Sequence, residues 1–223
     1  MDWLPAIFAG VAAAAFGWLA AGWQHYLYRE DEFRQNPARG SRLVAFRLGL
    51  GAAAGAVSFL ALRPDHYDAG AAAATAAFAV ALMLLASTDF ERKRIPNVVS
   101  YPAILAAGAV CWVWPDRSVA EIWLGAGIGL GAAAVLTLGG VAVGLAMRVR
   151  QAAFGLGDAK LIVLLGLLLG WPALLLGLFL GMIAAGVPAL ALMVLGRSRS
   201  VFSYGPFLAF GGVVALLWPE RFV

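Results

Sequence analysis

Residues 159–196 decide the fold, and they read AKLIVLLGLLLGWPALLLGLFLGMIAAGVPALALMVLG. A single helix of this length would measure about 57 Å, whereas the hydrocarbon core of a bilayer is about 30 Å thick. Gly170-Trp171-Pro172, near the middle of the stretch, is a typical turn signal. The stretch therefore predicts two consecutive transmembrane helices, over residues 159–170 and 172–196, joined by a tight turn.

The rest of the chain repeats this pattern of long apolar runs. Of the 223 residues, 63% are hydrophobic and 13% are charged, whereas about a quarter of the residues in soluble proteins are charged. The first run is long enough to span a bilayer and lacks the basic start of a signal peptide, so we expect a retained helix. We predict an all-α polytopic membrane protein with about eight transmembrane helices, over residues 3–23, 43–62, 69–88, 98–114, 119–147, 159–170, 172–196 and 204–218.

Basic residues fall on alternate loops of this eight-helix scheme. All of the 16 Lys and Arg residues lie on one side except Arg63, Arg117 and Arg221. By the positive-inside rule, the basic side faces the cytoplasm and both termini lie on the extracytoplasmic side. The net charge of +4 therefore reflects topology. The Arg clusters lack interleaved aromatic residues, so they indicate contact with the lipid bilayer and no nucleic-acid partner.

Other residue patterns point to packing. The single cysteine, Cys111, excludes a disulfide framework and a CxxC zinc site, and the two histidines are isolated, so we predict no metal and no cofactor. The glycine-rich run from Gly125 to Gly131 lacks the strand–turn–helix context of a nucleotide-binding loop. We interpret it, together with Gly49, Gly51 and Gly55, as surface for close helix packing.

Two aspartates, Asp89 and Asp158, stand at the ends of apolar runs and are 69 residues apart. A carboxylate at a bilayer boundary is costly and therefore indicates function. The topology above places both at the cytoplasmic membrane face. Two carboxylates that share a site can activate water and protonate a leaving group, which is general acid/base hydrolysis of an amide. The sequence contains no HExxH or GxSxG motif that would offer a rival mechanism.

Structural roles are open for both aspartates. Asp158 could be the N-cap of the helix over residues 159–170, and Asp89 could be an interfacial carboxylate screened by the basic residues of 92–94. If the two share a site, Asp158 at a helix N-terminus is the readier base. Asp89, near a helix C-terminus, more often holds the proton.

Three segments resemble motifs of the type IV prepilin peptidases, which are membrane aspartyl proteases with a GxGD signature. Asp89 is followed seven residues later by Pro96-Asn97, and residues 155–161, GLGDAKL, are similar to the family's GxGDxKL motif. Residues 204–209, YGPFLA, are similar to the start of the family's last helix. The resemblance covers roughly residues 43–218. It implies that Asp89 and Asp158 are catalytic, supported by Gly155, Gly157, Lys160, Pro96 and Asn97.

The resemblance implies cleavage of the short basic leader from prepilins or pseudopilins of type IV pili or type II secretion. The site would face the cytoplasm from the bacterial inner membrane. Residues 1–42 would form a first transmembrane helix and a short cytoplasmic loop, and residues 43–223 a transmembrane peptidase domain. Full-length members often carry a zinc-binding domain, associated with N-methylation, in that loop. Here the loop is too short and lacks cysteine, so we expect that domain to be lacking.

Other interpretations stay open at the level of sequence. Glu30, Asp31 and Glu32 in the first loop could attract a basic leader, although a solvated loop balanced by Arg29 and Arg34 is the simpler interpretation. A transporter or channel that uses the carboxylates as a proton relay is the main alternative function. Against it, no acid lies near a midplane and the inverted-repeat signature is absent. A catalytically inactive scaffold and a presenilin-like intramembrane protease are further alternatives.

Overall fold

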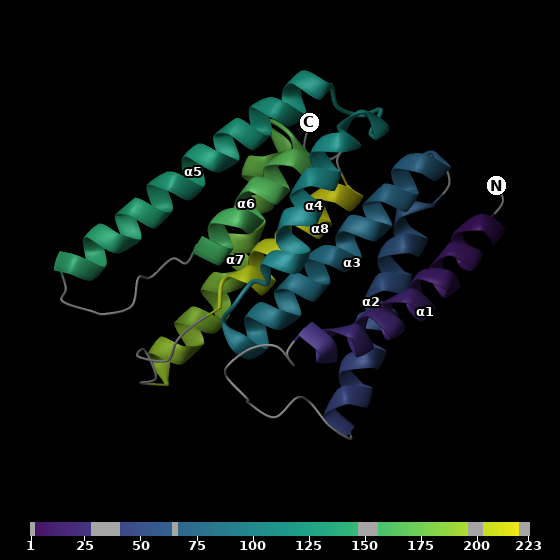
Figure 1. The fold of residues 1–223 in the computed structure, drawn as a ribbon, viewed down its shortest axis with the longest axis horizontal. Coiled ribbons are helices and arrows are strands. Elements are labelled where there is room, and N and C mark those ends of the chain that lie inside the picture. The colour runs from purple at the N-terminus through teal and green to yellow at the C-terminus, as the bar shows by residue number, and fades with distance from the viewer. Residues whose placement is uncertain (1–2, 28–40, 64–66, 147–155, 196–202, 219–223) are drawn as a thin grey trace. The chain divides into compact units, whose positions relative to one another are not determined.

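The computed structural model describes residues 3–27, 41–63, 67–146, 156–195 and 203–218, and every regular element within them is helical (Figure 1). Five of these helices are long and apolar enough to cross a membrane. The all-α polytopic class is thereby confirmed, while the number of spans and the side of the termini stay predictions. The helices are α1 (Leu4–Leu27), α2 (Ser41–Ala61), α3 (Ala69–Arg92), α4 (Asn97–Ala109), α5 (Val119–Ala146), α6 (Leu156–Leu169), α7 (Ala173–Val194) and α8 (Gly205–Leu217), with a 3-10 turn at Cys111–Val113.

Three of the helices are short. The helices α4, α6 and α8 contain 13, 14 and 13 residues, so each is about 20 Å long. The run predicted as one helix over 98–114 is divided, because α4 ends at Ala109 and a 3-10 turn follows. The helix predicted over 159–170 begins earlier, at Leu156, and therefore includes Asp158.

The chain forms two compact units, Met1–Leu84 and Leu85–Val223. In the first unit, α1 packs against α2 through small residues. A Cβ atom on Gly51 would lie 2.9 Å from the Ala14 carbonyl oxygen, and one on Gly17 would lie 2.8 Å from that of Leu50. Backbones therefore touch where the helices cross, as is typical of helix packing in membranes. This division at residues 84/85 does not test the predicted domain boundary after residue 42, which stays a prediction.

In the second unit, α6 packs against α4, α5, α7 and α8 (Figure 1). Its apolar side chains are almost entirely removed from solvent, and five of them are at most 1% exposed: Leu161, Ile162, Leu164, Leu165 and Leu168. Because α6 is held on several sides, the residues of its first turn stand on a rigid support.

Glycines bring α5 and α6 into backbone contact. A Cβ atom on Gly125 would lie 2.7 Å from the Gly166 carbonyl oxygen, and one on Gly129 would lie 3.0 Å from that of Ile162. Within the described residues, no atom lies within 4 Å of such a Cβ on Gly127, Gly131 or Gly49. The predicted packing surface is therefore confirmed for alternate glycines of the run, because a helix presents only one side to its neighbour.

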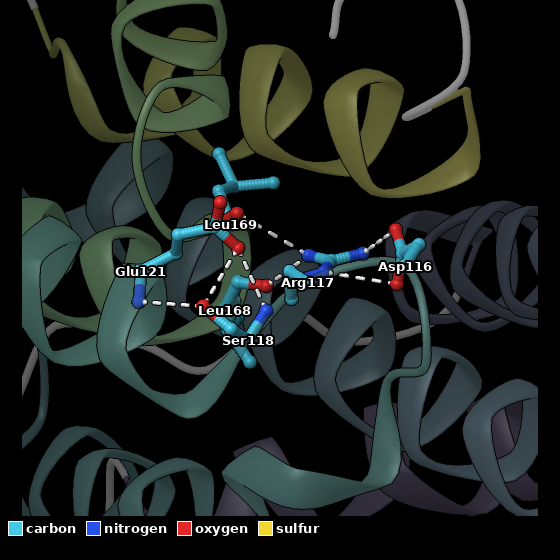
Figure 2. Close-up of polar contacts among 6 residues, drawn as sticks. All are labelled: Asp116, Arg117, Ser118, Glu121, Leu168 and Leu169. Atoms are coloured by element: carbon cyan, nitrogen blue, oxygen red, sulfur yellow. Dashed lines mark hydrogen bonds and ion pairs between the residues drawn. The ribbon is translucent and has the colours of Figure 1, made fainter.

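The C-terminal end of α6 is tied down by polar contacts (Figure 2). Arg117 donates a hydrogen bond to the Leu168 carbonyl oxygen and forms an ion pair of 2.6 Å with Asp116. At the start of α5, the Ser118 backbone N–H donates to Glu121 Oε2 over 2.7 Å, and the Glu121 N–H donates back to Ser118 Oγ over 3.2 Å. This reciprocal pair is a capping box.

The predicted turn between α6 and α7 is confirmed. Gly170 has a positive φ of 69°, which favours glycine, and the following Trp171–Pro172 peptide bond is cis. The Trp171 N–H donates to the Glu121 carbonyl oxygen over 2.9 Å. The loop before α5 and the turn after α6 are therefore joined at this end.

Candidate active site

Asp89 lies in the last turn of α3 and is 7% exposed. Its Oδ2 atom accepts hydrogen bonds from the Ser203 hydroxyl and, over 3.1 Å, from the Gly205 backbone N–H. Ser203 Oγ also lies 2.8 Å from the Asp89 carbonyl oxygen. A carboxylate that is nearly buried is thus satisfied by the segment that leads into α8.

Asp158 lies in the first turn of α6 and is partly exposed. Since the helix begins at Leu156, Asp158 is its third residue, and the alternative of an N-cap for a helix starting at 159 is wrong. The backbone N–H groups of a first helical turn and the helix dipole favour a negative charge there.

Both aspartates line one cleft, which has a volume of about 280 Å³. The cleft also contains three basic residues, an apolar side chain and a glycine: Lys93, Arg94, Lys160, Ile95 and Gly157. All of these residues belong to the second unit. The structure therefore brings together the two residues that the sequence singled out, in a basic environment open to solvent.

Two of the residues that are predicted to support the site, Lys160 and Gly157, contact the α3–α4 region beside this cleft. Lys160 Nζ donates to Asn97 Oδ1 and lies 4.8 Å from the centroid of the Tyr101 ring. A Cβ atom on Gly157 would lie 3.2 Å from Ile95 Cβ, so the absence of a side chain lets α6 approach the α3–α4 corner. Pro96 precedes α4 in an extended conformation.

Some predicted features cannot be placed. Gly155 lies outside the described residues, as do Glu30, Asp31 and Glu32 of the first loop. In the described part of the chain, no group of three or more His, Cys, Asp and Glu side chains could hold a metal ion.

Ser203 and Gly205 are the site residues that sequence reasoning missed. The YGPFLA segment resembles the start of the family's last helix, but nothing in its spacing indicates that it reaches Asp89. Gly205 is the first residue of α8, so the Asp89 carboxylate meets a helix N-terminus in addition to the C-terminal turn of α3. The two helix ends act on the Asp89 carboxylate in opposite directions, so the position at the end of α3 no longer indicates that Asp89 holds the proton.

The fold is helical, with five helices long and apolar enough to cross a membrane, and two carboxylates line one of its clefts. Residues 76–190, just over half of the chain, match the type IV leader peptidase family. The chain therefore belongs to the type IV leader peptidase family. The matched region contains both Asp89 and Asp158.

Two curated relatives are similar over a shorter segment. The chain is 37% identical over 68 residues to the "Prepilin leader peptidase/N-methyltransferase" of Aeromonas salmonicida (strain A449), and equally to that of Aeromonas salmonicida. The alignment covers 30% of this chain and 23% of each relative, so it spans about a quarter of their length. No solved structure matches the chain.

Proposed function

We propose that this protein is a membrane aspartyl endopeptidase that cleaves the short basic leader from prepilins or pseudopilins. The observation that carries the proposal is the meeting of Asp89 and Asp158, from α3 and α6, in one cleft. Membership of the type IV leader peptidase family supports it, as does the name of the similar Aeromonas proteins.

The chemistry follows from two carboxyl groups that differ in protonation. The ionised carboxylate takes a proton from a water molecule while the water oxygen forms a bond to the carbonyl carbon of the scissile amide. The protonated carboxyl group transfers its proton to the amide nitrogen as the C–N bond breaks. Such general acid/base help contributes about 10²–10⁴-fold to a rate. The partial exposure of Asp158 gives water a route to the pair.

We further propose that the cleft faces the cytoplasm from the bacterial inner membrane. Lys93, Arg94 and Lys160 gather at the level of the two aspartates, and basic residues are enriched at the cytoplasmic side of membrane proteins. The hydrophobic helix of the substrate would lie in the bilayer, with its leader among the cytoplasmic loops. We propose the peptidase step only. The first loop has no cysteines for the zinc-binding domain that is associated with methyl transfer in full-length members.

The test is cleavage of a prepilin-type substrate by the purified full chain in liposomes, comparing wild type with Asp89→Asn and Asp158→Asn. Each substitution keeps the side-chain shape and removes the ionisable group, so we expect kcat to fall by about 10³-fold or more. Asp68→Asn is the matched control on α3. Asp68 caps that helix through a 2.8 Å bond from the Ala71 N–H, and asparagine caps equally well.

The proposal is wrong if wild type does not cleave, or if either site variant keeps near-normal activity. Cleavage that persists in a chelator would separate this mechanism from metal-dependent hydrolysis. Proton-driven transport by the same liposomes, without cleavage, would favour the transporter.

A further inference from the structure

The Asp89 side chain is held from one side only. The Ser203 hydroxyl and the Gly205 N–H both donate hydrogen bonds to the same carboxylate oxygen, Oδ2. Among the described residues, no hydrogen bond reaches the other oxygen, Oδ1. A carboxylate held in this way has one oxygen fixed by the protein and one left for water or substrate.

Position 205 has no room for a side chain. A Cβ atom there would lie 2.6 Å from Asp89 Oδ2, 3.0 Å from its Cγ and 3.1 Å from its Cβ. Gly205 is helical and does not have a positive φ, so the requirement for glycine comes from space and not from backbone conformation. Any larger residue has to displace the carboxylate or the start of α8.

The body of α8 packs on the helix that carries Asp158. A Cβ atom on Gly212 would clash with the Leu165 side chain of α6, and Leu216 of α8 is completely buried. The helix α8 therefore contacts Asp89 with its first residue and α6 with its later turns. Its position sets where one aspartate stands relative to the other.

We propose that Ser203 and Gly205 are positioning residues for Asp89 in the proposed peptidase reaction. They fix Oδ2, orient Oδ1 into the cleft, and link the Asp89 carboxylate through α8 to the Asp158 helix. The inference rests on the proposed function for its kinetic consequences, while the contact with Asp89 can be measured without any substrate.

The kinetic test compares Gly205→Ala, Ser203→Ala and Ser203→Thr in the full chain in liposomes. Displacing a catalytic group by about 1 Å can cost about 100-fold in rate, so we expect that loss in kcat for Gly205→Ala with KM little changed. Losing one donor to a carboxylate should lower kcat about tenfold in Ser203→Ala. Ser203→Thr, which keeps the hydroxyl, should restore most of it. Gly186→Ala on α7, where a Cβ would have no atom within 4 Å, is the matched control.

The second measurement needs no cleavage. Ser203→Ala should lower the thermal midpoint of the folded protein. It should lower it less in the Asp89→Ala background, because the shared contact is then absent. This test uses only substitutions of Ser203 and Asp89, so it gives a result even if Gly205→Ala does not fold. Coupling without any cleavage by wild type would support the contact and overturn the proposed function alone.

The inference is overturned if wild type cleaves while Ser203→Ala and a folded Gly205→Ala keep its kcat, or if the two thermal effects simply add. It is also overturned if Gly186→Ala reduces kcat as much as Gly205→Ala, since the loss would then reflect general helix loosening.

Discussion

The two ends of α6 differ in how their polar groups are used. At the C-terminal end, the Arg117 side chain is 6% exposed. It donates a hydrogen bond to the Leu168 carbonyl oxygen and forms an ion pair with Asp116. At the N-terminal end, Asp158 and Lys160 are partly exposed and line a cleft. One end of the helix is closed by the loop before α5, and the other end lines an open cleft.

This contrast separates stability from chemistry within a single buried helix. The closed end and the glycine contacts with α5 fix the position of α6. The open end then offers charged groups on a support that does not have to rearrange. We therefore expect changes along the closed part to lower the free energy of unfolding and changes at the open end to affect turnover.

The largest effect on stability is expected from Gly166→Ala. The added Cβ would lie 2.6 Å from the Gly125 carbonyl oxygen and 3.0 Å from Ala126 Cα, both backbone atoms that cannot rotate away. Overpacking of this kind costs about 1–3 kcal/mol, and we expect the upper end of that range. Thermal unfolding in detergent measures the loss. Gly127→Ala on α5, which faces open space, should leave the midpoint unchanged, and equal losses in the two variants would contradict a close α5–α6 contact.

A smaller loss of stability is expected from Arg117→Met. The change keeps an apolar stem against Trp114 but removes the guanidinium group that donates to the Leu168 carbonyl oxygen and pairs with Asp116. Loss of such bonds costs about 1–3 kcal/mol. Turnover per folded molecule should stay at the wild-type value, because the change is at the closed end. A drop in kcat with unaltered stability would show that the two ends of α6 are not independent.

The smallest effect on stability is expected from Lys160→Met at the open end. The contact with Asn97 is exposed, and exposed charged contacts contribute about 0–1 kcal/mol. We expect unfolding to change by no more than that, while kcat/KM falls about fivefold because α4 and α6 are no longer joined at the cleft. Asn97→Ala should give the same result, and the double variant should be no worse than either. Full additivity of the two losses would show that Lys160 and Asn97 act separately.

Helices and their turn could be predicted because their signals are local. Apolar runs gave all eight helices, and Gly170-Trp171-Pro172 correctly divided α6 from α7. Helix boundaries were less predictable. Leu156 and Gly157 form the start of α6, although the glycines around them are typical of a turn. The division after Ala109 has no proline or charge to mark it.

The surroundings of Asp89 could not be predicted from sequence. Ser203 and Asp89 are 114 residues apart, and neither lies in a periodic pattern that would indicate a partner. The position of Asp158 at the start of a helix was easier to predict, because the apolar run after it and the glycines beside it are local features of the sequence. The resemblance implied that Lys160 and Asn97 both support the site, but nothing in the sequence indicated that these two residues, 63 positions apart, are hydrogen-bonded to each other.

The shortness of α4 and α8 has a consequence for the surrounding lipid. Helices of about 20 Å do not match a hydrocarbon layer of about 30 Å, and a bilayer responds to such mismatch by local thinning. Leu105 of α4 is 75% exposed and Phe210 of α8 is 58% exposed, so lipid chains would meet the mismatch directly. Headgroups would then sink toward the cleft beside these helices. In the proposed reaction, a substrate helix would emerge from the membrane at the depth of the two aspartates.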